Sequence, residues 1–179
     1  MKIQEDGLNG RRIPLRFVVK STPSSMHSLY EISRYLEGAP YCLTTVDTIF
    51  REKEFSNYIM ALNDAMETYS ADGLMAVTDY IDDEKPLYVQ TDDDLNITAF
   101  RDEPSDKDFY ISGGIYGITP RCNTIVASCR KRGVHSLRGY QRTLVAEGLR
   151  LRAYPFSKIV DVDHAGDIDT ARAFLAECH

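Results

Sequence analysis

The stretch YCLTTVDTIF, residues 41–50, decides the fold that the sequence predicts. Its first six residues, 41–46, carry no charge and predict a short buried strand, which ends at Asp47. Apolar residues then repeat at intervals of three and four over residues 52–69, the clearest amphipathic helix of the chain. The apolar run Gly73 to Thr78 follows as another buried strand. We therefore expect a strand–helix–strand unit with Asp47 at the carboxyl end of a strand.

A similar unit precedes this stretch. Residues 15–20 (LRFVVK) are β-branched and aromatic and predict a strand. Capping hydroxyls and Pro23 then introduce an amphipathic helix over residues 24–37. Two strand–helix passages followed by a third strand predict an α/β sheet with parallel strands and right-handed crossovers.

The pattern changes after Tyr80 to mixed α and β elements. We expect strands at 87–90, 95–100 and 110–118, followed by helices at 122–131 and 138–147. Strands at 149–155 and 158–162 and a closing helix at 166–177 complete the expected order. The acidic turn at 91–94 is interpreted as a solvated hairpin tip. Without an internal repeat or linker, the chain is expected to be one partial domain spanning residues 1–179.

Composition narrows the functional classes. The formal net charge of −6 argues against general nucleic-acid binding, although a nucleotide could still be held by local donors and a metal. No apolar run is long enough to cross a bilayer, and the first residues have no hydrophobic signal core. The four cysteines lack zinc-type spacing and are interpreted as reduced packing residues of a cytoplasmic protein.

Asp47 is the first candidate site residue. Ligands of open α/β sheets bind beyond the carboxyl ends of the strands, where an aspartate can hold a divalent ion that bridges a nucleotide phosphate. The structural alternative is that Asp47 caps the following helix. Because residues 48–50 separate Asp47 from that helix, a direct cap is not the obvious interpretation.

The segment KIVDVDHAGDI, residues 158–168, holds the second candidate site. Asp161 and Asp163 point to the same side of a strand, and two such carboxylates repel each other unless a cation or donor lies between them. The alternative is that Asp163 or Asp167 caps the last helix. Both interpretations can hold, with one acid capping and another binding metal.

Two further segments are candidates for a ligand-binding site: one contains paired glycines and the other is charged. The strand 110–118 contains Ser112-Gly113-Gly114, and paired glycines there indicate a bulge or a close backbone approach to a ligand. The bulge is the simpler interpretation. Residues 101–104 have the sequence RDEP and precede this strand.

Together, the ordered motifs VDTIF, DEP, GGIY and VDVD-x3-DI resemble the sugar-nucleotidyltransferase family, the nucleoside-diphosphate-sugar pyrophosphorylases and their phosphocholine cytidylyltransferase relatives. The resemblance covers about residues 15–176. It implies a Rossmann-like, three-layer, GT-A-like α/β domain with a mixed, mainly parallel sheet. It also implies transfer of a nucleotidyl group from a nucleoside triphosphate to a sugar-1-phosphate or similar phosphate, with Mg2+ neutralising the developing charge and pyrophosphate released.

The resemblance also implies roles for individual residues. Asp47 matches the family's metal-binding aspartate, and Asp161 or Asp163 matches the second metal-binding acid. The base-contacting loop corresponds to Ser24, Ser25 and Met26, while the sugar-contacting positions correspond to Asp102 and to Ser112, Gly113 and Gly114.

Three departures from the family pattern bear on activity. Glu103 replaces a lysine that contacts the sugar phosphate, and Ser25 stands where many members have glycine. The family's glycine-rich loop with an arginine and a following Pro-Lys pair, which cradles the triphosphate, has no counterpart in residues 1–14. The sequence is therefore expected to be an N-terminally truncated domain with little activity alone.

Truncation has a structural consequence. Without the family's first strand, residues 15–20 must detach, close up against residues 41–46, or pair with another copy of the chain. An unpaired apolar edge favours association, so a dimer or other homo-oligomer covering that edge is expected. The alternative function is a non-catalytic nucleotide- or sugar-phosphate-binding module. A glycosyltransferase and a DxD phosphatase fit the motif order less well.

Overall fold

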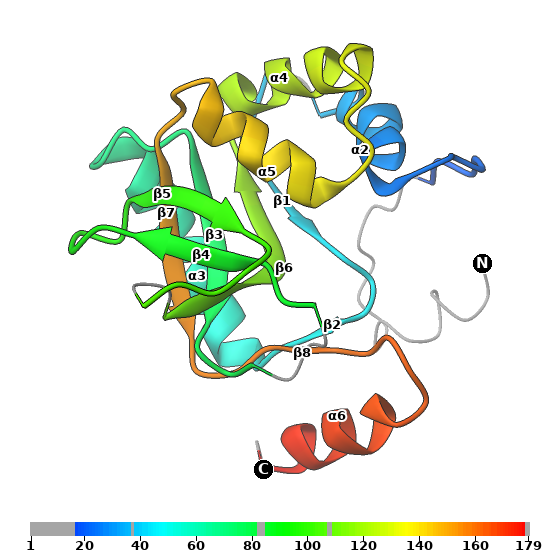
Figure 1. Cartoon of the computed structure of the whole chain (residues 1–179), viewed down its shortest axis with the longest axis vertical. Coiled ribbons are helices and arrows are strands. Elements are labelled where there is room, and N and C mark those ends of the chain that lie inside the picture. Colours follow the sequence, from blue (N-terminus) through cyan, green and yellow to red (C-terminus); the bar gives the residue numbers. More distant parts are fainter. Residues whose placement is uncertain (1–16, 37, 82–84, 107–108, 178–179) are drawn as a thin grey trace.

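The computed structural model describes residues 17–36, 38–81, 85–106 and 109–177 (Figure 1). Its helices are α2 (Ser25–Ser33), α3 (Glu52–Glu67), α4 (Pro120–Lys131), α5 (Leu137–Ala146) and α6 (Asp167–Ala176). Its strands are β1 (Tyr41–Thr44), β2 (Thr48–Ile49), β3 (Gly73–Thr78), β4 (Tyr88–Thr91), β5 (Ile97–Arg101), β6 (Tyr110–Ile118), β7 (Leu151–Phe156) and β8 (Val160–Asp161). The α/β class and the order of elements after residue 24 are confirmed.

Hydroxyl side chains start three of the helices. Ser24, Thr119 and Ser136 are the N-cap residues of α2, α4 and α5, and each side-chain oxygen accepts a backbone N–H of the first turn. Pro120 occupies the first turn of α4, where a missing N–H costs nothing. Local sequence alone therefore places these helix starts.

The central sheet has the strand order β5-β4-β6-β3-β7, and β1 also pairs with β6. The sheet is mixed, as predicted. The expectation that it is mainly parallel is wrong for the described strands, because only β3 and β7 pair in parallel. In the expected strand–helix–strand unit, β1 and β3 do run in the same direction, but β6 lies between them and runs in the opposite direction. Ile118 pairs with Tyr41 on one edge and with Gly73 on the other.

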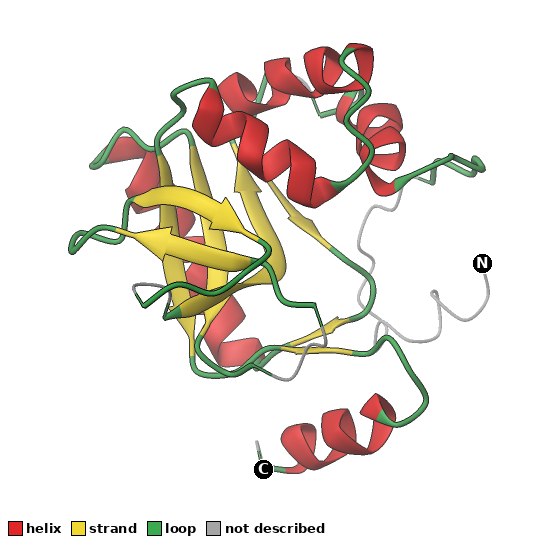
Figure 2. Ribbon diagram, viewed as in Figure 1, coloured by secondary structure: helices red, strands yellow, loops and turns green. Residues whose placement is uncertain are grey.

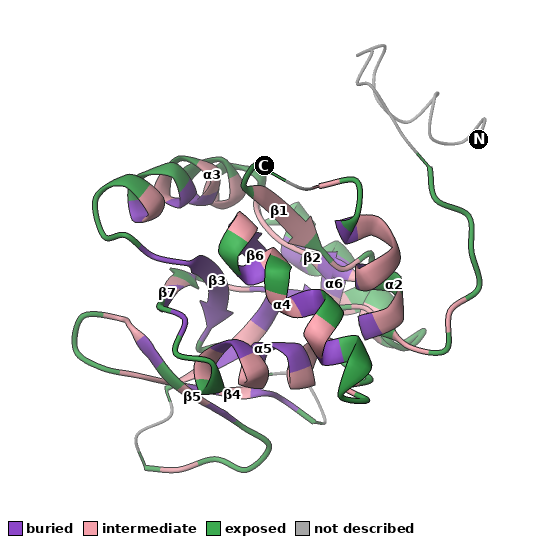
Figure 3. Ribbon diagram, turned by 90° about the horizontal axis from the view of Figure 1, so that it is seen from above, coloured by how far each residue is buried: buried purple, intermediate pink, exposed green. Residues whose placement is uncertain are grey.

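Helices cover both faces of this sheet, which gives the expected three layers (Figure 2). Along β3 the side chains alternate between the faces. Leu74 and Ala76 pack with α3, whereas Met75 and Val77 pack with α2, α4 and α5. Because both faces are covered, every residue of β3 is buried, as Figure 3 shows.

A smaller unit lies beyond the central sheet. β2 and β8 form a two-stranded antiparallel ladder, and α6 follows β8 (Figure 1). A separate small cluster of Val160, Ala171 and Phe174 holds α6. The chain thus carries the VDVD motif on an arm outside the central sheet.

The predicted strand 15–20 is wrong over its described part, because residues 17–20 belong to no strand. Residues 15 and 16 lie outside the described residues. Phe17, Val18 and Val19 are 53%, 44% and 96% exposed. Of the three positions expected for this segment, the structure shows the detached one, since no described strand offers it a partner. The homo-oligomer remains a prediction.

No described helix is both long enough and apolar enough to span a bilayer. Cys42, Cys122 and Cys129 are free thiols, and Cys178 lies outside the described residues. Burial raises the pKa of the Cys42 and Cys122 thiols to about 11. These two thiols are therefore packing groups of low reactivity, as the sequence predicted.

Candidate active site

The β2–β8 ladder brings Asp47 and Asp161 to one place. Thr48 pairs with Asp161 in the ladder, and its hydroxyl donates to a carboxylate oxygen of Asp161 at 3.0 Å. The backbone N–H of Val162 donates to the carbonyl oxygen of Asp47, also at 3.0 Å. Two acids that lie far apart in the sequence are therefore fixed side by side through backbone pairing.

The glycine pair of β6 forms the bulge that the sequence predicted. The register between β3 and β6 shifts between Met75 and Val77, which pair with Tyr116 and Ser112. Gly114 has a φ of +72°, a conformation that disfavours any residue with a Cβ. A Cβ there would also collide with the hydroxyls of Thr45 and Thr48. The glycines thus allow residues 45–48, the Asp47 loop, to pack directly on β6.

Two cavities flank this bulge and share three lining residues: Ser112, Arg138 and Asp161. The larger cavity has a volume of about 470 Å3 and the smaller about 290 Å3. Asp163 lines the larger one, whereas Asp47 lines the smaller one. Because they share residues, we treat the two cavities as one cleft over β6.

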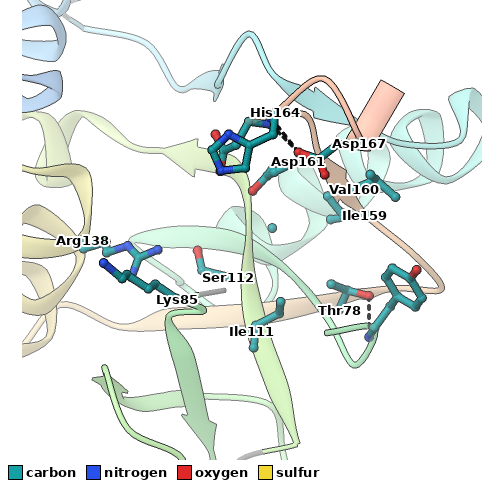
Figure 4. Close-up of a pocket in the computed structure, with 13 residues that line it drawn as sticks. Thr78, Lys85, Ile111, Ser112, Arg138, Ile159, Val160, Asp161, His164 and Asp167 are labelled. Carbon is teal, nitrogen blue, oxygen red and sulfur yellow. Dashed lines mark hydrogen bonds between the residues drawn. The ribbon is translucent and has the colours of Figure 1, made fainter. Parts of the chain in front are cut away.

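Opposite charges face each other across the larger cavity. Arg138 from α5 and Lys85 from the segment before β4 lie on one side, and Asp161, His164 and Asp167 lie on the other (Figure 4). Cations on one wall attract phosphate oxygens, while carboxylates on the other suit a metal ion. The cleft therefore offers complementary places for a metal-bound phosphate ligand.

Both acids lie near the phenol of Tyr116, which is buried. The pKa of Tyr116 is raised to about 12, mainly by burial. The negative charges of Asp161 and Asp47 contribute to this increase, whereas a hydrogen bond with Ser112 opposes it. Both carboxylates thus lie close enough to this buried side chain to act on it electrostatically.

None of the acids Asp47, Asp163 and Asp167 is the N-cap residue of a helix. Arg51 is the N-cap residue of α3, so Asp47 is not a cap. Gly166 is the N-cap residue of α6, so neither Asp163 nor Asp167 caps it. Instead, the Asp167 carboxylate accepts the backbone N–H groups of Asp163 and His164 at 3.0 and 2.7 Å. Asp167 therefore shapes the turn that carries Asp163.

Most of the other sequence-derived site residues also lie in the cleft. Ser25 lines the smaller cavity, and Ser112, Gly113 and Gly114 form the bulge between the cavities. Ser24 lines neither cavity and instead caps α2. Met26 is fully buried in the core and also lines neither.

Asp102 lies apart from the cleft. It lines neither cavity and forms an ion pair with Arg142 of α5, at 2.6 Å. The Arg142 guanidinium also donates to the carbonyl oxygen of Phe100 at 3.3 Å. Asp102 thus helps to attach α5 to β5.

Sequence analysis missed the residues that α5 and the Asp47 loop contribute. Arg138 and Gln141 line the cleft from α5, and Thr45 lines it beside Asp47. Within α5, Arg138 and Gln141 are three residues apart and so share a helix face with buried Leu144. That spacing could have flagged two polar residues on a core-facing stripe.

The acids do not form a dense metal cluster. Among the described residues, no group of three or more His, Cys, Asp or Glu side chains could hold a metal ion. The donors present are two carboxylates and nearby threonine hydroxyls, all oxygen ligands. Mg2+ is commonly held by one or two carboxylates together with substrate phosphates, so this donor set fits Mg2+ bound with a nucleotide.

No protein-family model matches the sequence, and comparison with curated protein sequences gives no match. Solved structures do match. The inositol-1-phosphate CTP transferase from T. maritima superposes with a TM-score of 0.69 at 18% identity, over 87% of this chain and 62% of that one. A Bacillus anthracis protein described as a glucose-1-phosphate thymidylyltransferase gives a TM-score of 0.75 at 14% identity, over 96% and 68%. The fold is that of the sugar-phosphate nucleotidyltransferases.

A UDP-glucose pyrophosphorylase complexed with UDP-glucose gives the same result, with a TM-score of 0.72 at 17% identity, over 99% of this chain and 74% of that one. The resemblance inferred from the motifs is therefore supported by the structure. The chain spans about 62% of the length of the inositol-1-phosphate CTP transferase. At sequence identities this low, the structural superpositions establish the nucleotidyltransferase fold alone, and function has to be argued from the site.

Proposed function

We propose that this chain is a nucleotidyltransferase-type domain that binds a nucleoside triphosphate and a sugar-1-phosphate or similar phosphate. In the reaction, an oxygen of the acceptor phosphate forms a bond to the α-phosphorus of the nucleotide. The bond from that phosphorus to the β-phosphate breaks, and pyrophosphate leaves with the electron pair. The three solved structures named above are described as enzymes of this kind, which supports the proposal.

The observation that carries the proposal is that the β2–β8 ladder places Asp47 and Asp161 in the lining of one cavity, in a cleft whose opposite wall is basic. Asp161 lines both cavities, whereas Asp163 lines only the larger one. Asp161 is therefore the better partner for Asp47, and Asp163 would serve the larger cavity. We therefore propose Asp161, rather than Asp163, as the second metal ligand.

Positioning and charge neutralisation are the two tasks of the protein in such a reaction. Asp47 and Asp161 would hold Mg2+, which supplies neutralisation of the phosphate charge when bound. Arg138 and Lys85 would attract phosphate oxygens to the other wall. The backbone at Gly113 and Gly114 lets Ile159, Thr45 and Thr48 pack closely against β6 and so helps to position Asp47.

The second candidate is a module that binds nucleotide or sugar phosphate without catalysis. Both candidates use the same cleft, and they differ in pyrophosphate release.

The test is calorimetric titration of the full chain with CTP and with UTP, each in Mg2+ and in EDTA. We expect Mg2+-dependent binding that Asp47→Asn and Asp161→Asn each weaken by about tenfold or more, since charge-assisted contacts contribute about 1.5–3 kcal/mol. The double variant should be scarcely weaker than either single one, because both acids act through one ion.

Asp169→Asn is the matched control. Its carboxylate lies on α6, is 87% exposed and pairs with Arg172, outside both cavities. Nucleotide binding that is equal in Mg2+ and EDTA, or that Asp169→Asn weakens as much as Asp47→Asn, would contradict the proposal. Pyrophosphate release that Asp47→Asn abolishes would identify a competent enzyme, and binding without release would identify the module.

A further inference from the structure

Gln141 is a buried amide whose bonding is incomplete. It belongs to α5, is 1% exposed and lines the smaller cavity. Its side-chain Nε2 donates to the hydroxyl of Ser112 at 2.9 Å. Its Oε1 is buried and has no hydrogen-bond partner among the residues that the structure describes. One half of the amide is therefore engaged and the other is not.

Packing alone does not explain this residue. Its buried neighbours on α5, Tyr140 and Leu144, belong to the apolar core. A carbonyl oxygen removed from water without a partner lowers stability, and a methionine of similar size would avoid that cost. The position thus retains a polar group at the wall of a cavity despite an energetic penalty.

The orientation of the amide is fixed by its neighbours. Its Nε2 is bonded to Ser112 of β6. Arg142, the next residue of α5, is attached to Phe100 and Asp102. The side chain of Gln141 is therefore held in the wall of the smaller cavity.

A carbonyl oxygen is a hydrogen-bond acceptor only, so the group that it can bind must carry an N–H or O–H. A bare phosphate oxygen does not qualify, since it is itself an acceptor. The two cavities meet at Ser112, the residue that holds Gln141, so a ligand in the cleft passes beside this amide.

We propose that Gln141 determines specificity by accepting a hydrogen bond from a hydroxyl or amino group of the substrate. The proposal rests on the nucleotidyltransferase function for the identity of the substrates. It favours acceptors such as glucose 1-phosphate or phosphoethanolamine over phosphocholine, whose trimethylammonium group has no hydrogen to donate. A ligand without a donor leaves Oε1 buried and unpaired, and such a site rejects it.

The test uses the full chain and three phosphate probes: glucose 1-phosphate, phosphoethanolamine and phosphocholine, each titrated with Mg2+ and nucleotide present. The test variant is Gln141→Met, and the control is Gln90→Met. Gln90 lies on β4, bonds Arg101 through its Oε1 and lines neither cavity. We expect Gln141→Met to weaken donor-bearing probes about tenfold and to leave phosphocholine unchanged. Gln90→Met should change none of them.

A second arm locates the donor. CTP and UTP place their base donors differently: cytosine has a 4-amino group, whereas uracil has a 4-carbonyl and an N3–H. Loss confined to one of the two nucleotides would assign the hydrogen bond to the base, and loss confined to glucose 1-phosphate or phosphoethanolamine would assign it to the acceptor. Either result supports the proposal.

Stability separates this role from a structural one. Gln141→Met removes an unpaired acceptor but also the hydrogen bond from Nε2 to Ser112, so the two effects oppose each other and the thermal midpoint should change little. A lowered midpoint with equal weakening of every probe, or unchanged binding of all three phosphate probes and of both nucleotides, would overturn the inference. If the wild-type chain binds no nucleotide and no phosphate probe, the proposed function fails and the inference falls with it. Binding that depends on Asp47 but not on Gln141 overturns the inference alone.

Discussion

The β6 wall of the cleft and the β8 wall are held in different ways. The β6 wall, Ser112 to Tyr116, belongs to the central sheet, and most of it is buried between two helical layers. The β8 wall, Asp161 to Asp167, is mostly exposed and is attached through a two-residue ladder and α6. The groups that line the cleft from β6 and α5 are therefore held by the core, whereas Asp161 and Asp163 lie on an exposed arm.

Phe174→Ala should break the β8 wall and give the largest effect on stability. Phe174 is fully buried, and the cationic groups of Arg51 and Lys158 lie 5.1 Å from the centre of its ring. Loss of such a side chain costs about 3–5 kcal/mol. We expect α6 to open locally, which hydrogen exchange of residues 160–177 would detect as lost protection with the central sheet unchanged.

The control for this variant is Leu175→Ala, since Leu175 is 46% exposed on the same helix. It should change stability by less than about 0.5 kcal/mol. Equal loss of protection in β3 after Phe174→Ala would show that the arm and the sheet unfold together, and the contrast between the walls would be lost.

Gly114→Ala should break the β6 wall and rank second. Its left-handed backbone and the collision with Thr45 and Thr48 together predict a loss of about 2–4 kcal/mol. Urea unfolding measures the change. Gly148→Ala is matched in backbone conformation, with a φ of +74° and no neighbour within 4 Å of the added Cβ.

The difference between these two glycine variants isolates the close contact at the bulge. We expect Gly148→Ala to cost only about 1 kcal/mol. If both variants lose the same stability, the Asp47 loop does not depend on close packing against β6.

Asp102→Asn should give the smallest effect, because Asp102 lies outside both walls. Its ion pair with Arg142 is 64% and 38% exposed, so solvent screening limits the loss to less than about 1 kcal/mol. Binding of glucose 1-phosphate, measured by calorimetry, should be unchanged. A large loss of binding without a loss of stability would instead return Asp102 to the sugar-contacting role that the family resemblance implies.

Local patterns were sufficient for many features. The helix at 52–67, the buried strand 73–78 and the glycine bulge follow from periodicity, apolar runs and paired glycines, which act over a few residues. The capping hydroxyl before α2 was visible for the same reason. The segment 15–20 was misjudged because strand propensity forms no strand without a partner to accept its hydrogen bonds.

The sequence by itself determined where the acids stand along the chain: Asp47 after a strand, and Asp161 and Asp163 before the last helix. Only the tertiary structure decided that Asp47 and Asp161 line one cavity, that β6 separates β1 from β3, and that Gln141 is buried in the wall of the cleft. The physical reason is that strand order and side-chain burial depend on pairing between distant segments. Periodicity within a segment determines which face is apolar, but not which distant segment covers that face.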